Sequence, residues 1–397
     1  MKIFHFPLFA ALFAFATVNA QPGPRVWDEA DILRAVESNS PTLQRAAAAA
    51  QAQRTQARTG NSLPDPELGY THTWGSSGSA GENEYTVSQG FDFPSAYVQR
   101  GRLAGAREHA ADAAYRNQRI AVLLQARLTV QRILYLQKRL EVDSLRLADA
   151  LFARQIALRR AEAGDITSIE ENRIGFQALS AQNNLTRTRM ALQTARTELS
   201  VLSGLPAAEL TAITPMPVPP LPPLEQLVDK ACADDPQLCA AKADQQAALA
   251  ERRLAVSLAL PRFNAGYKHS TSDGMNFNGV TAGMSLPLFS PRNTVRLARL
   301  RQEESRALSR EIETRLTAEI AARYAQARQL ETMFASYGPQ QDREGKSVLL
   351  RKALDAGSMS ILEYFTQLDP VYRNMDEWNE LTYNYRSLVI ELGKYAL

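Results

Sequence analysis

The stretch between Pro94 and Pro206 carries apolar residues at the spacing of a long packed helix. Those in its middle lie three, four or seven positions apart: Ile133, Leu136, Leu140, Leu147, Leu151 and Leu158. Such spacing puts the side chains on one face of a helix and is typical of the seam between long helices. The obvious break comes at Gly164, because glycine accepts the left-handed conformation that ends many helices. The stretch therefore predicts a long helical hairpin that turns at residues 163–167.

The two arms of this hairpin differ in length. The outgoing arm from Ser95 has about 65 residues, or about 95 Å of helix, whereas the return to Gly204 has about 38 residues. An alanine-rich helix expected from Pro41 to about Gly60 supplies the missing length if it stacks end to end on the shorter arm. Helices of this length favour an elongated body over a compact globular domain.

Two segments ahead of the hairpin alternate like β-strands. They are residues 67–74 and 85–93, and a polar, glycine-rich loop joins them. In the second segment, apolar and aromatic side chains share one face, and small or polar side chains share the other. This alternation is typical of a membrane β-barrel with a wet lumen, and also of an ordinary sheet packed on helices.

The whole pattern occurs twice along the chain. Residues 69–73 (Gly-Tyr-Thr-His-Thr) return as residues 266–270 (Gly-Tyr-Lys-His-Ser), and the turn at Gly164 returns at Gly357. The second copy predicts a helix over 236–259, strands over 262–270 and 277–288, and a hairpin with arms 293–354 and 360–395. The predicted domains are a signal peptide (1–20), a first repeat (21–212), a proline-rich linker (213–223) and a second repeat (224–397).

Strand counting indicates how many copies assemble. Four strands cannot close a barrel, and a bilayer does not tolerate their open edges. Three copies give twelve strands, an even number in the usual range for membrane barrels. The predicted fold class is mainly α with a small membrane β part. Duplicated helical hairpins form a trimeric α-barrel, and four strands per chain contribute to a 12-stranded trimeric β-barrel.

The first twenty residues have the pattern of a secretory signal peptide. A basic start is followed by an apolar run to Val18, and Ala20 supplies the small residue that a signal peptidase needs. The run is shorter than the about 20 residues that a membrane-spanning helix requires. We expect cleavage after about Ala20 and no lipid anchor, because no cysteine lies nearby.

Composition and motifs argue against catalysis and against nucleic-acid binding. The net charge is +3 with acids and bases interleaved, which leaves no basic surface for nucleic acid. No phosphate loop, nucleophile elbow or Cys/His metal cluster is present, so we predict neither an enzyme nor a cofactor. The cysteines, Cys232 and Cys239, straddle Pro236. In an exported protein they form either a disulfide or two buried free thiols.

Taken in order, these features resemble the TolC-like outer membrane efflux proteins. The resemblance covers residues 30–397, and it rests on the duplicated order of helices and strands together with three short motifs. These are residues 63–70 (Leu-Pro-Asp-Pro-Glu-Leu-Gly-Tyr), 286–288 (Leu-Pro-Leu) and 356–358 (Ala-Gly-Ser).

The resemblance implies a homotrimer in the outer membrane with a large periplasmic portion. It also implies a passive exit duct for small molecules or ions, which works with a periplasmic adaptor and an inner-membrane pump in a tripartite efflux or type I secretion system. The alternative is a soluble periplasmic coiled-coil adaptor or structural protein. Adaptors, however, resemble one hairpin flanked by many strands.

The resemblance further implies a periplasmic gate just after the second turn. There Glu363 matches a gate aspartate of the family and Met359 matches a gate arginine, so the usual charged latch is incomplete. Leu354 is a further gate candidate, and the alternative for Glu363 is a solvated helix residue. Pro339 and Pro370 flank this turn and predict that the second hairpin bends inward.

By resemblance, adaptor contacts are expected at the exposed turns, that is at Gly164, Asp165, Gly357 and Ser358. Strand alternation separately predicts an outward-facing set of aromatic residues at the lipid interface, namely Tyr70, Trp74 and Tyr267. His72 and His269 share the faces of these aromatics, which argues against a metal site. The chain has few histidines and no methionine cluster at ligand spacing, so the sequence leaves both metal ions and drugs open as cargo.

Overall fold

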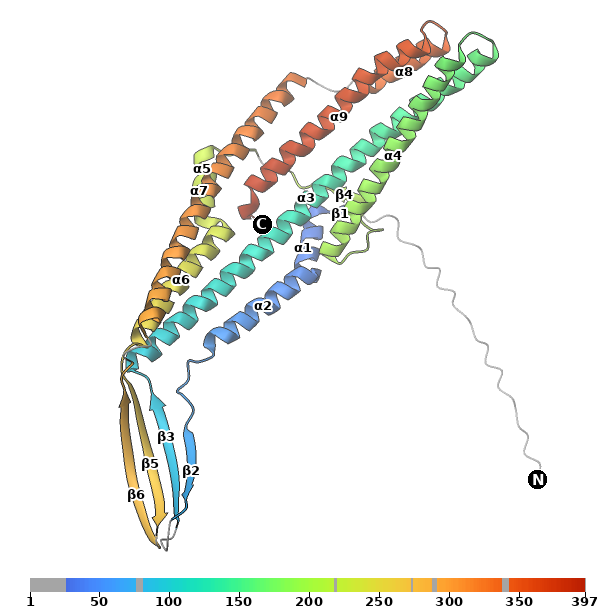
Figure 1. Cartoon of the computed structure of the whole chain (residues 1–397). Helices are drawn as coiled ribbons and strands as arrows, with labels where there is room; N and C mark the ends of the chain where they lie inside the picture. Colours follow the sequence, from blue (N-terminus) through green and yellow to red (C-terminus); the bar gives the residue numbers. More distant parts are fainter. Residues whose placement is uncertain are drawn as a thin grey trace, which may run out of the picture.

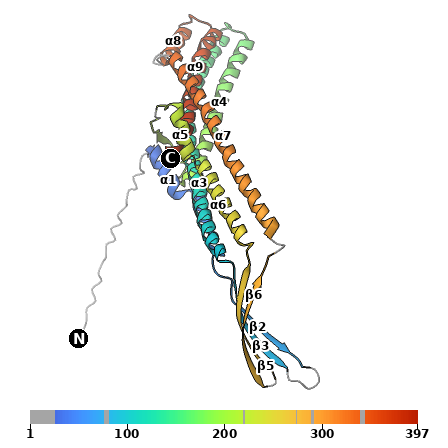
Figure 2. The same cartoon turned by 90° about the vertical axis from the view of Figure 1, so that its left-hand side faces the viewer.

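The computed structural model describes residues 26–75, 81–217, 220–272, 274–287, 291–337 and 343–396. The chain is elongated, with a β-sheet at one end and the turns of two helical hairpins at the other (Figures 1 and 2). The elements follow in this order: β1 (Val26–Asp28), α1 (Glu29–Asn39), α2 (Pro41–Arg58), β2 (Glu67–Thr73), β3 (Glu82–Phe91), α3 (Pro94–Glu162), α4 (Ser168–Ser203), β4 (Ala212–Thr214), α5 (Leu224–Asp234), α6 (Pro236–Ser257), β5 (Arg262–Ser272), β6 (Met275–Ser285), α7 (Pro291–Tyr337), α8 (Arg343–Asp355), α9 (Ile361–Leu392) and a 3-10 turn, η1 (Lys394–Ala396).

The first repeat has the helices that its apolar spacing predicts. Helix α3 runs unbroken for 69 residues, and α4 returns along it for 36. Gly164 takes a positive φ of 77° at the turn, and Thr167 caps α4 by accepting a hydrogen bond from the backbone of Glu170. Helix α2 lies along the part of α3 that α4 does not cover (Figure 1). The prediction of one long helix beside two shorter ones is therefore confirmed here.

The second repeat departs from the prediction in its outgoing arm. We predicted one helix over 293–354, but α7 ends at Tyr337 and α8 begins at Arg343. Figure 1 shows that α8 does not continue the direction of α7. Pro339, the first proposed kink residue, lies outside the described residues. Pro370 lies inside α9, which continues past it.

The four longer strands form one antiparallel sheet in the order β2-β3-β5-β6. Because alternate residues of a strand face opposite ways, the register divides the sheet into two chemically different faces. One face is mainly apolar and aromatic: Leu68, Tyr70, Tyr85, Val87, Phe263, Tyr267, Val280 and Met284. The other is small and polar: Gly69, Thr71, Glu84, Thr86, Gly266, Lys268, Gly279, Thr281 and Gly283. The predicted alternation is thus present, and β3 starts three residues earlier than expected, at Glu82.

The described residues contain two further strands that the sequence analysis missed. β1 and β4 pair in parallel near the middle of the long body, so the first residues of the predicted linker belong to a strand. Beside them the Glu29 carboxylate is fully buried and accepts hydrogen bonds from Arg127 Nε (2.9 Å), Gln131 Nε2 (3.4 Å) and the backbone N–H of Met216 (2.7 Å). This carboxylate ties the linker and α1 to α3.

Apolar side chains fill four regions within the described part of the body. One lies among α1, α3, α4 and the β1–β4 pair, and a second among α5, α6, α7 and the end of α9. A third lies near the hairpin turns among α3, α4, α8 and α9, and a small fourth lies between α3 and α4. None of the described helices is both long enough and apolar enough to cross a membrane.

Candidate functional site

A buried carboxylate joins the two hairpins near their turns. Asp149 lies in α3 and is 1% exposed. Its Oδ1 accepts hydrogen bonds from Tyr364 OH (2.9 Å) and Arg351 Nε, and its Oδ2 accepts from Ser347 Oγ (3.1 Å) and Tyr372 OH. Each oxygen therefore has two donors. Since α8 and α9 supply all four, one side chain of the first hairpin holds both arms of the second.

Helical spacing explains why four donors converge on one point. Ser347 and Arg351 are one turn apart in α8, while Tyr364 and Tyr372 are about two turns apart in α9, so each pair shares a helix face. Apolar side chains of α3, α4, α8 and α9 are buried in the same region: Ile156, Ile174, Leu354, Ile361 and Leu368. A water-poor surrounding of this kind strengthens hydrogen bonds to a carboxylate, and makes the loss of a partner costly.

Burial also fixes the protonation of the two phenols. It raises the pKa of Tyr364 and Tyr372 well above the ordinary value of 10.0, and the negative charge of Asp149 raises both further. Burial opposes the charge of Arg351, but the hydrogen bond and charge of Asp149 outweigh it and leave the pKa of this guanidinium raised. Both tyrosines are thus hydrogen-bond donors at neutral pH, and Arg351 is a cation. We call Asp149 and its four donors the Asp149 cluster.

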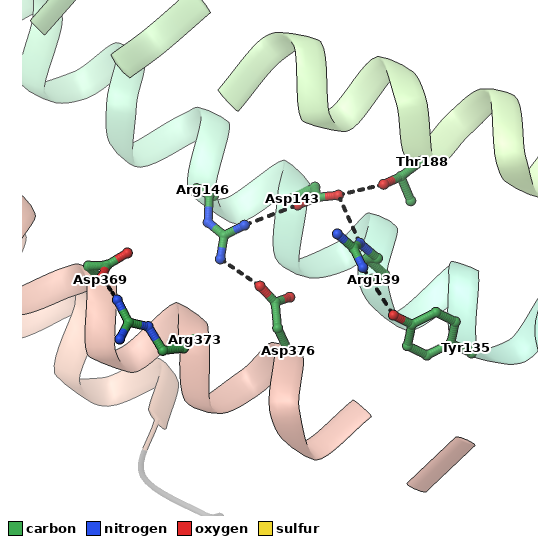
Figure 3. A network of polar contacts seen from close by, with 8 residues as sticks. All are labelled: Tyr135, Arg139, Asp143, Arg146, Thr188, Asp369, Arg373 and Asp376. Carbon is green, nitrogen blue, oxygen red and sulfur yellow. Dashed lines mark hydrogen bonds and ion pairs between the residues drawn. The ribbon is translucent and has the colours of Figure 1, made fainter. Parts of the chain in front are cut away.

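A second polar network, centred on Arg146, touches the Asp149 cluster through Tyr372. Figure 3 shows this network. Arg146 of α3 reaches Asp376 of α9 at 2.8 Å and Asp143 of its own helix at 3.4 Å. The buried Asp143 also accepts a hydrogen bond from Thr188 Oγ1 of α4 at 2.7 Å. The Arg146 guanidinium lies 5.0 Å from the ring centre of Tyr372, so the two networks touch. These contacts join α4 to α3 and α3 to α9.

A groove of about 950 Å³ lies between α4 and α9, over α3. Its lining mixes charges of both signs with apolar side chains, and includes Arg160, Arg173, Glu170 and Phe365. Asp376 also lines it, and the Oδ1 of this residue has no hydrogen bond within the described part of the chain.

The predicted gate residues surround the Asp149 cluster without belonging to it. Glu363 is exposed and caps α9: its carboxylate accepts from the backbone N–H of Ser360, and its own N–H donates to Ser360 Oγ at 3.1 Å. Thr167 and Glu170 form the same capping box at the first hairpin. Leu354 is fully buried, and Met359 packs against the same apolar region. Helix capping is thus sufficient to account for the position of Glu363.

The sequence analysis missed Asp149, Tyr364 and Tyr372. Tyr364 directly follows the residue at which counting from the turn placed the gate. A signal was present, because Asp143 and Asp149 are charged residues within an otherwise apolar helical seam, where a carboxylate needs partners. Their partners, however, lie up to 223 positions away in the chain.

The predicted adaptor-contact residues lie where a partner has access to them. Gly164 and Asp165 are exposed at the first turn, and Gly357 and Ser358 are exposed at the second. Both turns are at the end of the molecule remote from the sheet (Figure 1).

The two cysteines are free thiols, and both are partly buried. Cys239 Sγ donates to the carbonyl oxygen of Ala233 at 3.5 Å. Of the two states that the sequence allows, the structure contains the unbonded one.

The predicted interface aromatics are exposed on the sheet, and two of them occur in matching clusters. Tyr70 OH donates to Asn83 Oδ1 (2.9 Å), which His72 Nδ1 also contacts at 2.7 Å. In the second repeat, the equivalent residues Tyr267 and His269 both contact Asn278 Oδ1 at 2.7 Å. Trp74 stacks edge-on against the ring of His72. Across the described residues, no group of three or more His, Cys, Asp or Glu side chains is placed to hold a metal ion.

Residues 227–396 match the outer membrane efflux protein family. The fold is similar to the outer-membrane channel OprN, with a TM-score of 0.75 and 15% identity, over 92% of this chain and 89% of that one. It is also similar to VceC of Vibrio cholerae (TM-score 0.74, 16% identity, 92% and 95% of the two chains). A third similar structure is CmeC of Campylobacter jejuni (0.71, 14%, 92% and 85%).

No curated protein matches the chain in sequence. The resemblance to the TolC-like outer membrane efflux proteins is nevertheless confirmed by the family match and by the fold. The matched family is that of outer membrane efflux proteins and the similar structures are outer-membrane channels, neither of which are enzymes, so the prediction of a protein that is not an enzyme is confirmed as well.

Proposed function

Because residues 227–396 carry the outer membrane efflux protein signature and the chain folds like outer-membrane channels, we propose that the protein is the exit duct of an efflux system. Three copies form a passive conduit from the periplasm to the exterior for small molecules or ions. The observation that carries this proposal is the combination of an amphipathic, open-edged sheet with a helical body whose two hairpins are held together at its far end.

The sheet suits a membrane barrel in both its chemistry and its edges. Its apolar face would contact lipid, with Tyr70, Trp74 and Tyr267 near the interface, and its polar face would line a wet lumen. β2 and β6 form the two edges of the sheet, and neither has a second partner strand among the residues that the structure describes. Edges of this kind need closure within a bilayer, and twelve strands from three copies supply it.

We propose further that the Asp149 cluster is the restraint that keeps the periplasmic end narrow. Moving the second hairpin away from the first would break the hydrogen bonds that Asp149 accepts from all four donors. The bonds from the two buried phenols to this charged acceptor contribute about 1.5–3 kcal/mol each, and a difference of that total size keeps a two-state element almost entirely in one state. The capped start of α9, with Met359, Leu354 and Glu363, would move with that hairpin.

In this proposal the exposed turns are where a periplasmic adaptor docks. A partner that binds Gly164, Asp165, Gly357 and Ser358 better in the open arrangement would shift the hairpins toward it, since a ligand biases a conformational equilibrium only through differential affinity. An inner-membrane pump would supply the energy, because the duct itself carries out no reaction.

Fractionation and conductance measurements test the proposal. The processed protein should appear in the outer membrane as a heat-resistant trimer, and the purified trimer should conduct ions across a planar bilayer. A soluble periplasmic monomer would contradict it. The susceptibility of a deletion strain to a panel of drugs and metal ions would then identify the cargo class.

A further inference from the structure

The duplication of the chain has consequences for the sheet that go beyond the number of strands. The two β-hairpins, β2–β3 and β5–β6, have equivalent registers. Gly69 lies opposite Thr86 in the first hairpin, and Gly266 lies opposite Thr281 in the second. Likewise, His72 faces Asn83, and His269 faces Asn278. The repeat is therefore preserved residue by residue in three dimensions, and not only in sequence.

The register between the two β-hairpins of one chain is set by the pairing of β3 with β5. Here β3 pairs with β5, so that Thr86 lies opposite Lys268 and Gly90 opposite Asn264. In the two repeats β2 is equivalent to β5, and β3 is equivalent to β6. If the copies continue the repeat around a ring, then β6 pairs with β2 of the next copy in the way that β3 pairs with β5 within the chain. Replacing each residue of the β3–β5 pair by its repeat equivalent then gives the register between copies.

We infer that β6 of one copy pairs antiparallel with β2 of the next copy, with Thr281 opposite Thr71 and Ser285 opposite Glu67. The same register places Gly283 opposite Gly69 of the next copy. This inference rests on the proposed trimer, and adds to it which residues face each other across the subunit boundary. A slip of one residue would reverse the faces of a whole strand, so the register is also what keeps lipid and lumen on opposite sides.

The helices independently indicate the same neighbour. Helices α3 and α7 both begin at a proline, and counting from these prolines makes Leu103 equivalent to Leu300, and Ala111 equivalent to Leu308. Leu103 and Ala111 are 6% and 3% exposed, whereas Leu300 and Leu308 are 50% and 48% exposed. One face of the second long helix is thus uncovered at positions where the first is buried.

The element that covers this face of α3 is α6. Arg107, which lies between Leu103 and Ala111 on the same face, reaches Glu251 of α6 at 3.7 Å. The repeat equivalent of α6 is α2, and α2 of the same chain lies along α3. The α2 that would cover Leu300 and Leu308 therefore belongs to the next copy, which is the same neighbour that the strand register requires.

The subunit boundary differs from the internal junction in one respect. Inside the chain, Lys268 reaches Glu84 at 2.5 Å across β3 and β5. Their repeat equivalents are Thr71 and Gly279, which cannot form an ion pair. The boundary between copies therefore lacks this ion pair on its polar face, and its stability depends on backbone pairing and on the covered leucines.

Paired cysteines test the register. In a chain with Cys232→Ser and Cys239→Ser, the matched pairs are Thr71→Cys with Thr281→Cys and Glu67→Cys with Ser285→Cys. Opposed residues of antiparallel strands have Cα atoms about 4.5–5.5 Å apart, within the range for a disulfide. Within one chain β2 and β6 are separated by two strands, about 14 Å, so a bond has to join two copies.

The controls use the same four substitutions in exchanged pairs. Thr71→Cys with Ser285→Cys and Glu67→Cys with Thr281→Cys are each four residues out of register, or about 13 Å. We expect the matched pairs to give roughly tenfold more linked species on non-reducing gels of outer membranes than the exchanged pairs do.

Native mass measurement of the same samples separates the possible failures. A trimer that links better through the exchanged pairs, or through neither, overturns the register and leaves the proposed duct intact. A monomer in which none of the cysteine pairs forms a disulfide overturns both the register and the proposed duct.

Discussion

Replacing Asp149 with asparagine tests the proposed restraint at its centre. Asparagine keeps the size of the side chain but removes the negative charge, and turns one of its two acceptor groups into a donor. The amide would then meet four donors with a single carbonyl oxygen. Two of these donors, the hydroxyls of Tyr364 and Tyr372, come from α9, and two, from Ser347 and Arg351, come from α8.

The magnitude follows from the burial of each contact. Hydrogen bonds from the two buried phenols to a charged acceptor contribute about 1.5–3 kcal/mol each. The Arg351 side chain is 37% exposed, so its ion pair is screened by solvent and adds no more than about 1 kcal/mol. Asp149→Asn should therefore weaken closure by about 3–7 kcal/mol. A change of about 4 kcal/mol shifts the closed-to-open ratio by roughly a thousandfold.

Single-channel recording in planar bilayers measures this shift as open probability. Asp149→Asn should open the channel far more often than the unmodified protein does, while the heat resistance of the trimer shows that the fold is intact. Asp369→Asn is the matched control, because the Asp369–Arg373 pair lies on α9 but is 64% and 68% exposed. If Asp149→Asn forms trimers whose open probability equals that of Asp369→Asn, the cluster is not the restraint.

Three further predictions concern other parts of the chain. The pKa of Tyr364 and of Tyr372 is raised, which means that the protonated phenols stabilise the closed state. Open probability should therefore stay constant from about pH 7 to pH 9 and rise only beyond about pH 10. A rise in open probability between about pH 7 and pH 9 would contradict this assignment. Glu29→Ala removes a buried carboxylate from three donors and should lower the free energy of unfolding by about 3–5 kcal/mol. Thermal unfolding would show this as a lower midpoint temperature, and an unchanged midpoint would show that these contacts do not stabilise the fold. Thr71→Lys combined with Gly279→Glu should create across the subunit boundary the ion pair that Lys268 and Glu84 form inside the chain. This pair should raise the dissociation temperature of the trimer slightly, because an exposed ion pair contributes less than about 1 kcal/mol. Neither single substitution should raise it.

The sequence predicted those elements whose pattern repeats many times within them. The hairpin of α3 and α4 agrees with its prediction to within about two residues, because dozens of apolar positions define its spacing. The sheet was predicted for the same reason, although two strand ends shifted by three residues. β1 and β4 were missed because three-residue strands are too short to show alternation. The division of the second arm into α7 and α8 was missed because apolar spacing continues on both sides of it.

The candidate site was predicted only in its location. Counting from the second turn led to the correct end of α9, but selected Glu363, a residue whose local contacts are those of a helix cap. The residue that joins the hairpins is Asp149, which precedes its partners by about 200 positions. Its role depends on how α3, α8 and α9 are rotated about their axes, and no property of a single helix contains that information.

By itself, the sequence determined the duplication, the helical hairpins and the two-faced strands, because periodicity is a local consequence of helix and strand geometry. Only the tertiary structure decided which carboxylate is buried between the hairpins, that the two thiols are unbonded, and which register each strand pair adopts. These features arise from contacts between segments far apart in the chain, where small rotations and shifts determine which side chains meet. The duplication then extends the observed register to the next copy of the chain, where the proposed channel closes.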